Sequence, residues 1–140
     1  MNLNSKPKEI QVIIIENDED ERVFMQEGFE ASGKFKILAM LRNGDQLISW
    51  VDSHPDDHPH LILSDLNMPG KNGYDIIEFA SGLSRPIPVI ITSTSTTQSI
   101  IRKCLDAGAA DYLVKPDTFI EYQPFAEKLY ELVIEKKIVS

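Results

Sequence analysis

The sequence predicts an α/β protein in which a parallel sheet is covered by helices on both faces. Five short apolar runs alternate with five amphipathic stretches along the 140 residues. The runs are continuously apolar rather than alternating, which is typical of strands that are buried on both faces. Strict alternation of strands and helices favours right-handed crossovers, which place helices on both sides of the sheet.

The five expected strands are short and rich in β-branched residues. The first is the clearest, because all six residues from Ile10 to Ile15 except Gln11 are apolar and β-branched. Two of the others are only three residues long. In chain order the expected strands cover residues 10–15, 35–41, 61–63, 88–92 and 112–114.

The expected helices fall between the strands and after the last one. In each of them apolar residues recur every three or four positions and so form one face. Gly108 is placed to end the fourth helix, because glycine readily adopts the left-handed conformation that follows many helices. The expected helices cover residues 21–32, 45–52, 74–80, 97–107 and 120–137, and residues 1–8 and 138–140 are expected to be loose ends.

Length and charge narrow the classes of function. A chain of 140 residues fits one domain, here residues 1–140 with a core over about 10–137, and we expect no output domain. The net charge of −8 argues against binding to nucleic acid or to an anionic membrane. No signal peptide or membrane-spanning run is evident, and the single cysteine, Cys104, allows no intrachain disulfide, so a cytoplasmic location is expected.

Polar side chains follow four of the five apolar runs, where each expected strand ends. Because the carboxyl ends of parallel strands meet at one edge of a sheet, these side chains are expected to converge. A single such residue would be read as a turn or cap, but four loops that carry polar groups indicate a site. The residues are Glu16, Asn17 and Asp18 after the first run, Ser64 and Asp65 after the third, Thr92 to Ser95 at the end of the fourth, and Lys115 after the fifth.

The chemistry of these groups points to phosphoryl transfer. Clustered carboxylates repel one another, so either their pKa values rise or a cation neutralises them. Oxygen ligands without imidazole or thiolate suit a hard ion, Mg²⁺ in particular. Beside Mg²⁺ the carboxylate of Asp65 can attack phosphorus and form an aspartyl phosphate. Lys115 would supply a positive charge to the phosphoryl oxygens, and Ser93 or Thr92 a hydroxyl donor.

Three segments resemble the receiver domains of two-component response regulators. They are LILSDLNMPGKNGYD (61–75), IPVIITSTS (87–95) and AGAADYLVKP (107–116), and the resemblance extends over roughly residues 10–137. Each motif is weak alone, whereas three in the right order are specific. The resemblance implies a doubly wound, flavodoxin-like three-layer sandwich, with a five-stranded parallel sheet in the order 2-1-3-4-5.

The resemblance also implies a role for each site residue. Asp65 matches the phosphoacceptor, and Lys115 matches the lysine that contacts the phosphoryl group. The spacing to Lys115 and Gly108 selects Ser93 as the switch hydroxyl, with Thr92 as the alternative, and Tyr112 matches the switch aromatic. The peptide bond between Lys115 and Pro116 is expected to be cis. The implied Mg²⁺ ligands are Glu16, Asn17, Asp65 and the backbone carbonyl of Asn67.

Asn17 departs from the family pattern, in which two acids usually follow the first strand. An amide oxygen can ligate Mg²⁺ but brings no negative charge, so weaker metal binding is expected. The expected function is a stand-alone receiver that takes a phosphoryl group from a sensor histidine kinase or a histidine phosphotransfer protein. It would signal through contacts with a downstream protein, with no enzymatic activity beyond its own phosphorylation and dephosphorylation. The alternative is a receiver-like interaction module that is not phosphorylated.

Simpler explanations exist for some of these residues. Thr92 to Thr97 form a run of six hydroxyl residues, and hydroxyls favour turns and helix caps. Tyr112 can be a core aromatic of a strand. An aspartate-dependent phosphatase is disfavoured, because Asn67 stands where such enzymes usually carry a second aspartate.

Overall fold

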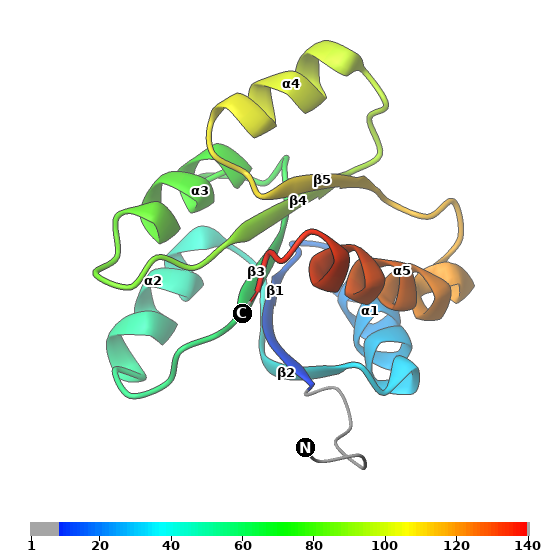
Figure 1. Cartoon of the computed structure of the whole chain (residues 1–140), viewed down its shortest axis with the longest axis horizontal. Helices are drawn as coiled ribbons and strands as arrows, with labels where there is room; N and C mark the ends of the chain where they lie inside the picture. Colours follow the sequence, from blue (N-terminus) through cyan, green and yellow to red (C-terminus); the bar gives the residue numbers. More distant parts are fainter. Residues whose placement is uncertain (1–8, 140) are drawn as a thin grey trace.

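A five-stranded parallel sheet forms the centre of the molecule, as the sequence predicts (Figure 1). The computed structural model describes residues 9–139, so the expectations for residues 1–8 and 140 fall outside it. The strand order is β2-β1-β3-β4-β5 and every pair is parallel, which confirms the predicted topology. The strands are β1 (Ile10–Ile15), β2 (Phe35–Leu41), β3 (Leu61–Asp65), β4 (Val89–Ser93) and β5 (Asp111–Val114).

Helices cover both faces of the sheet, so that the molecule has three layers (Figure 1). On one face α1 and α5 lie side by side, and α2, α3 and α4 cover the other. A short 3₁₀ turn, η1 (Phe119–Glu121), leads into α5. The helices are α1 (Glu19–Ser32), α2 (Gly44–Ser53), α3 (Gly73–Ser81), α4 (Gln98–Asp106) and α5 (Tyr122–Glu135).

Two apolar clusters, one on each face of the sheet, form the core. Successive residues of a strand point to opposite faces, so a strand that is apolar throughout feeds both clusters. In β1, Val12 and Ile14 pack with α1 and α5, whereas Ile13 and Ile15 pack with α2, α3 and α4. All four of these residues are at most 1% exposed, which explains the continuous apolar run in the sequence.

Most predicted boundaries are correct to within two residues, and the differences matter at the strand ends. The third and fourth strands extend further than predicted, so Asp65 and Ser93 are the last residues of β3 and β4. Gly108 follows the end of α4 with a φ of +112°, as expected for a helix stop. The prediction that residues 138 and 139 are loose is wrong, because both pack against the α1–α5 cluster and the Ile138 N–H donates to the Val133 carbonyl.

Local capping fixes where the helices at the carboxyl edge of the sheet begin. The Asp18 side chain accepts a hydrogen bond from the Glu21 N–H at 2.8 Å and starts α1. Asn72 and Asp75 form a reciprocal capping box at the start of α3. Within residues 9–139, none of the helices has both the length and the apolar character needed to cross a membrane.

Candidate functional site

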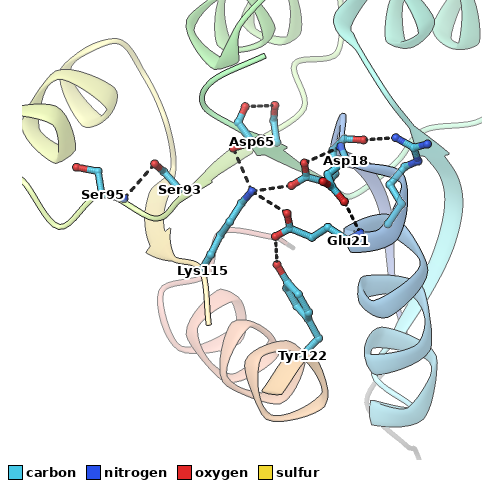
Figure 2. A network of polar contacts seen from close by, with 10 residues as sticks. Asp18, Glu21, Asp65, Ser93, Ser95, Lys115 and Tyr122 are labelled. Atoms are coloured by element: carbon cyan, nitrogen blue, oxygen red, sulfur yellow. Dashed lines mark hydrogen bonds and ion pairs between the residues drawn. The ribbon is translucent and has the colours of Figure 1, made fainter. Parts of the chain in front are cut away.

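The ends of β1, β3 and β5 bring two carboxylates and a lysine together at the carboxyl edge of the sheet (Figure 2). The Lys115 Nζ lies 2.7 Å from Glu16 Oε1 and 3.4 Å from Asp65 Oδ1. Glu16 and Asp65 are only 1% and 7% exposed. The convergence inferred from the order of polar residues is therefore present for these three groups.

The strand order explains why these particular side chains meet. Asp65 is the last residue of β3, and β4 separates it from β5. Lys115 follows β5, and its long side chain reaches past the end of β4 to groups on β3 and β1. Glu16 and Asp65 continue the alternation that sends Ile14 and Leu63 into the α1–α5 cluster, so their side chains point to the same face.

The electrostatics of the pocket favour a cation. Burial, together with the neighbouring Asp65, raises the pKa of Glu16 to about 7. Burial also raises the pKa of Asp65 above its ordinary value, against the opposing effect of Lys115. Although burial favours the neutral amine, the surrounding carboxylates raise the pKa of Lys115, which keeps it charged. The interactions of Lys115 with Glu16 and Asp65 therefore do not fully offset the burial of these carboxylates.

The donor set at this edge fits Mg²⁺. Glu16 and Asp65 supply buried carboxylate oxygens, and Asn17 and Asn67 are exposed residues in the loops that follow β1 and β3. All of these donors are oxygens, which suit a hard cation. In residues 9–139 no group of three or more His, Cys, Asp or Glu is arranged to hold a metal ion. A bound cation would consequently depend on amide and backbone oxygens as well as on carboxylates.

The two candidate switch hydroxyls are both buried at the end of β4 but differ in their contacts. The Ser93 Oγ accepts a hydrogen bond from the Ser95 N–H at 3.2 Å. The Thr92 Oγ1 is buried and has no hydrogen-bond partner among the described residues. Thr92 is in register with Asp65 on the neighbouring strand, and Ser93 lies one residue further toward the carboxyl edge.

Tyr112 lies inward, on the face of the sheet that α2, α3 and α4 cover. Its ring is only 8% exposed and belongs to the apolar cluster of that face. Its hydroxyl donates to the Ser95 carbonyl at 2.8 Å, which ties β5 to the loop between β4 and α4. Tyr112 is therefore both a core residue of this face and a hydrogen-bond donor to the β4–α4 loop.

Two residues of the site were not identified from the sequence. Glu21 on α1 contacts Lys115, with Oε2 3.3 Å from Nζ, and it also accepts a hydrogen bond from the hydroxyl of Tyr122 on α5. In the sequence, Glu21 belongs to an acidic stretch, residues 18–21, that the favourable charge of a helix start explains by itself. The sequence did offer one indication of the role of Glu21. It lies on the same helix face as Met25 and Gly28, so an acidic residue occupies the end of a buried stripe.

One expectation near the site is wrong. Lys115–Pro116 was expected to be a cis peptide bond, but the part of the chain that the structure describes, residues 9–139, contains no cis bond. The Lys115 side chain reaches the pocket with this bond in the trans form.

Comparison with protein families gives a match over most of the chain. The family model described as "Response regulator receiver domain" matches residues 12–122. The transcriptional regulatory protein MalR of Bacillus subtilis is 31% identical over 137 residues, which cover 94% of this chain and 53% of MalR. A protein-glutamate methylesterase/protein-glutamine glutaminase of Carboxydothermus hydrogenoformans is 29% identical over 128 residues, 89% of this chain and 35% of that protein. The chain thus spans about one third to one half of these two relatives.

Solved structures show the same fold. The response regulator domain of CheB from Thermotoga maritima superposes with a TM-score of 0.76 at 20% identity, covering 95% of this chain and 99% of that one. The phosphorylated cyanobacterial phytochrome response regulator RcpA gives a TM-score of 0.76 at 19% identity, covering 91% and 95%. At these identities the likeness shows the fold alone.

Proposed function

Because this chain belongs to the response regulator receiver domain family, we propose that it accepts a phosphoryl group on Asp65. The observation that carries the proposal is the buried Asp65 carboxylate at the end of β3 with the Lys115 ammonium 3.4 Å away. A carboxylate in this setting is partly desolvated and faces a fixed positive charge, which suits attack on an anionic phosphoryl group. The donor would be a phosphohistidine on a sensor histidine kinase or a histidine phosphotransfer protein.

The proposed transfer needs no reactant besides Asp65 and the phosphohistidine donor. An Asp65 carboxylate oxygen forms a bond to phosphorus as the bond between phosphorus and the donor imidazole nitrogen breaks. The electron pair of the broken bond stays on that nitrogen, and the donor ring, already protonated on its other nitrogen, leaves as neutral imidazole. Lys115 would contact the phosphoryl oxygens, and the hydroxyl of Ser93, or of Thr92, would donate to one of them.

In this proposal Mg²⁺ would be held by the side chains of Glu16, Asn17 and Asp65 and by the carbonyl of Asn67. When bound, it would neutralise charge on the carboxylates and on the phosphoryl oxygens. Burial raises the pKa of both Glu16 and Asp65, which disfavours their ionised forms, and a bound cation would offset this cost.

Signalling would follow from a change at the β4–α4 loop. If the Ser93 hydroxyl turns toward a phosphoryl group, it gives up its contact with the Ser95 N–H. Ser95 also carries the carbonyl that Tyr112 binds, so the loop and the aromatic ring are coupled through one residue. We propose that a downstream protein reads this change through direct contact, and that the domain itself acts only on its own phosphorylation state.

Intact-mass spectrometry after incubation with acetyl phosphate and Mg²⁺ tests the proposal. We expect one phosphoryl adduct on the wild-type protein and none on Asp65→Asn. Asp57→Asn serves as a matched control, because it removes an exposed carboxylate from the loop before β3 and should leave the adduct intact. The proposal fails if no adduct forms at saturating Mg²⁺, or if the adduct survives Asp65→Asn.

A second candidate function rests on Asn17. With an amide in place of an acid, the side chains of this site would serve only as the polar edge of an interaction module that is never phosphorylated. The same experiment separates the two functions. An absence of adduct with both acetyl phosphate and phosphoramidate, in a folded protein, would favour the interaction module.

A further inference from the structure

A third carboxylate reaches Lys115 from the helix α1. The Glu21 Oε2 lies 3.3 Å from the Lys115 Nζ, and its Oε1 accepts a hydrogen bond of 2.5 Å from the Tyr122 hydroxyl (Figure 2). Both oxygens of Glu21 therefore have a partner: Lys115, which follows β5, and Tyr122, at the start of α5. The side chain is only 14% exposed, so water competes little for these contacts.

Tyr122 is a rigid anchor for this carboxylate. It is the first residue of α5 and only 1% exposed, and its ring packs edge-to-face on Phe125 with centroids 5.5 Å apart. A buried hydroxyl is costly without a partner, and Glu21 supplies that partner. Burial and the hydrogen bond to Glu21 raise the pKa of Tyr122, so the hydroxyl remains a donor.

The close packing of α1 and α5 makes this contact possible. Gly28 lies two helical turns after Glu21 on the same face of α1. A β-carbon at Gly28 would lie 2.6 Å from the carbonyl carbon of Tyr122, so the two backbones are in direct contact there. The approach of the helices at Gly28 places the Tyr122 backbone directly beside α1, and from there the Tyr122 hydroxyl reaches Glu21 two turns earlier.

Glu21 is one of three carboxylates that lie around the Lys115 ammonium. A lysine ammonium has three N–H donors, and three carboxylates surround Lys115. Their oxygens lie at 2.7 Å for Glu16, 3.3 Å for Glu21 and 3.4 Å for Asp65. Glu16 and Glu21 accept hydrogen bonds from the ammonium and Asp65 forms an ion pair with it, so both glutamates help to set its resting position.

We propose that Glu21, anchored by Tyr122, is a positioning residue that holds the Lys115 ammonium beside Asp65. The role of that ammonium toward a phosphoryl group rests on the function proposed above. Lys115 has a long, flexible side chain, and a bond to Glu16 alone would leave it several rotamers. With Glu21 as a second acceptor, the ammonium is held between α1 and the sheet before any phosphoryl group arrives, which lowers the entropic cost of the transfer.

Three variants test this role. Glu21→Gln keeps the shape and an acceptor for Tyr122 but removes the charge that binds Lys115. Tyr122→Phe keeps Glu21 but removes its anchor. Asp20→Asn is the matched control, because it removes the same charge from the same turn of α1 at an exposed position outside the pocket. Thermal unfolding of each variant checks that the fold is retained.

The first measurement is the ¹H–¹⁵N signal of the Lys115 ammonium in Mg²⁺-free protein, identified by its loss in Lys115→Arg. Held by three carboxylates, the ammonium protons should exchange slowly and be visible. We expect Glu21→Gln to broaden the signal beyond detection, Tyr122→Phe to weaken it, and Asp20→Asn to leave it unchanged. An unchanged signal in Glu21→Gln would overturn the proposal.

The second measurement is the rate of phosphorylation by phosphoramidate at saturating Mg²⁺. We expect a loss of about tenfold in Glu21→Gln and a smaller loss in Tyr122→Phe, because misplacing a positioned group by a fraction of an ångström slows a reaction by such factors. Asp20→Asn should match the wild type, and a Glu21→Gln rate equal to that of Asp20→Asn would contradict the role of Glu21. If the wild type forms no adduct but its ammonium signal responds to Glu21→Gln, the proposed phosphorylation fails and the positioning of Lys115 stands.

Discussion

Position 17, an exposed residue in the loop that follows β1, carries an amide where the resemblance to receiver domains would place an acid. The acids that do line the pocket are two buried carboxylates from strand ends, Glu16 and Asp65, and one from a helix, Glu21. A single lysine faces all three. Individual residues therefore determine the net charge of the site, and replacing Asn17 with an acid would add one negative charge to it.

Replacing Asn17 with aspartate should tighten Mg²⁺ binding. Asn17 directly follows the buried Glu16, so the new carboxylate would add a charged oxygen ligand close to the pair of Glu16 and Asp65. We expect the dissociation constant for Mg²⁺ to fall by about tenfold, as ligand charge is a main determinant of affinity for hard cations. Titration with Mg²⁺, followed by NMR chemical shifts of the β1–α1 loop, measures it.

Gln98→Glu is the control for this change, because it adds the same charge at an exposed position at the start of α4. It should bind Mg²⁺ as the wild type does. Equal affinities for Asn17→Asp and the wild type would show that position 17 does not contact the cation.

At the scale of helices and strands, the contact between α1 and α5 connects packing to the site. Both helices cover the same face of the sheet and share a cluster that includes Phe29 and Phe125. Gly28 removes the side chain that would keep them apart, and Tyr122 uses this proximity to reach Glu21. The same glycine that permits close packing therefore also supports the position of Lys115.

Gly28→Ala should destabilise the protein although alanine favours helices. The new methyl group would meet backbone atoms of Tyr122 and Gln123 at 2.6–2.7 Å, and backbone cannot move aside as easily as a side chain can. Overpacking of this kind costs about 1–3 kcal/mol, which outweighs the gain of about 1 kcal/mol in helix propensity. Urea denaturation measures the free energy of unfolding.

Gly82→Ala provides the comparison. A methyl group there would lie at least 3.4 Å from the nearest atoms, and the backbone of Gly82 has a negative φ that alanine accepts. It should be neutral or slightly stabilising. If Gly28→Ala proved as stable as Gly82→Ala, the helices would have more room between them than the structure shows.

At the scale of the whole molecule, the site places two buried carboxylates, whose ionisation is unfavourable, within an otherwise well-packed fold. Two apolar clusters on the two faces of the sheet hold the strands in place. Their rigidity forces Glu16 and Asp65 together at the carboxyl edge, where burial raises the pKa of both. Ionised carboxylates in such a place lower the stability of the folded state.

Asp65→Asn should therefore raise the thermal stability of the Mg²⁺-free protein. The pKa of Asp65 is higher in the folded than in the unfolded state, so its ionisation costs nothing at a pH below the unfolded value, and the cost grows as the pH rises toward the folded value. Asparagine removes this cost, so the variant should melt a few degrees higher at neutral pH, with a smaller difference in acid. Differential scanning calorimetry at several pH values measures the effect.

Asp57→Asn, at an exposed position, should leave the melting temperature nearly unchanged across the same pH range. A lower melting temperature for Asp65→Asn at neutral pH would mean that the ion pair with Lys115 stabilises the fold more than the burial of Asp65 destabilises it.

The sequence by itself determined the strands, the helices and the edge of the sheet at which the site lies. Continuous apolar runs and polar residues at their ends are local features, and the topology of a parallel sheet converts their order along the chain into proximity. Asp65 and Lys115 could be predicted in this way, since each directly follows or ends a recognisable apolar run.

Only the tertiary structure decided which groups hold Lys115 and which polar groups lack partners. The contact between Glu21 and Tyr122 joins residues 101 positions apart, and that between Glu16 and Lys115 joins residues 99 apart. Such contacts depend on how closely α1 approaches α5 and on how far a lysine reaches across β4. The unpaired hydroxyl of Thr92 is likewise a property of its surroundings in the folded chain. Periodicity in the sequence shows which face a residue occupies, whereas the packing of that face determines what the residue touches.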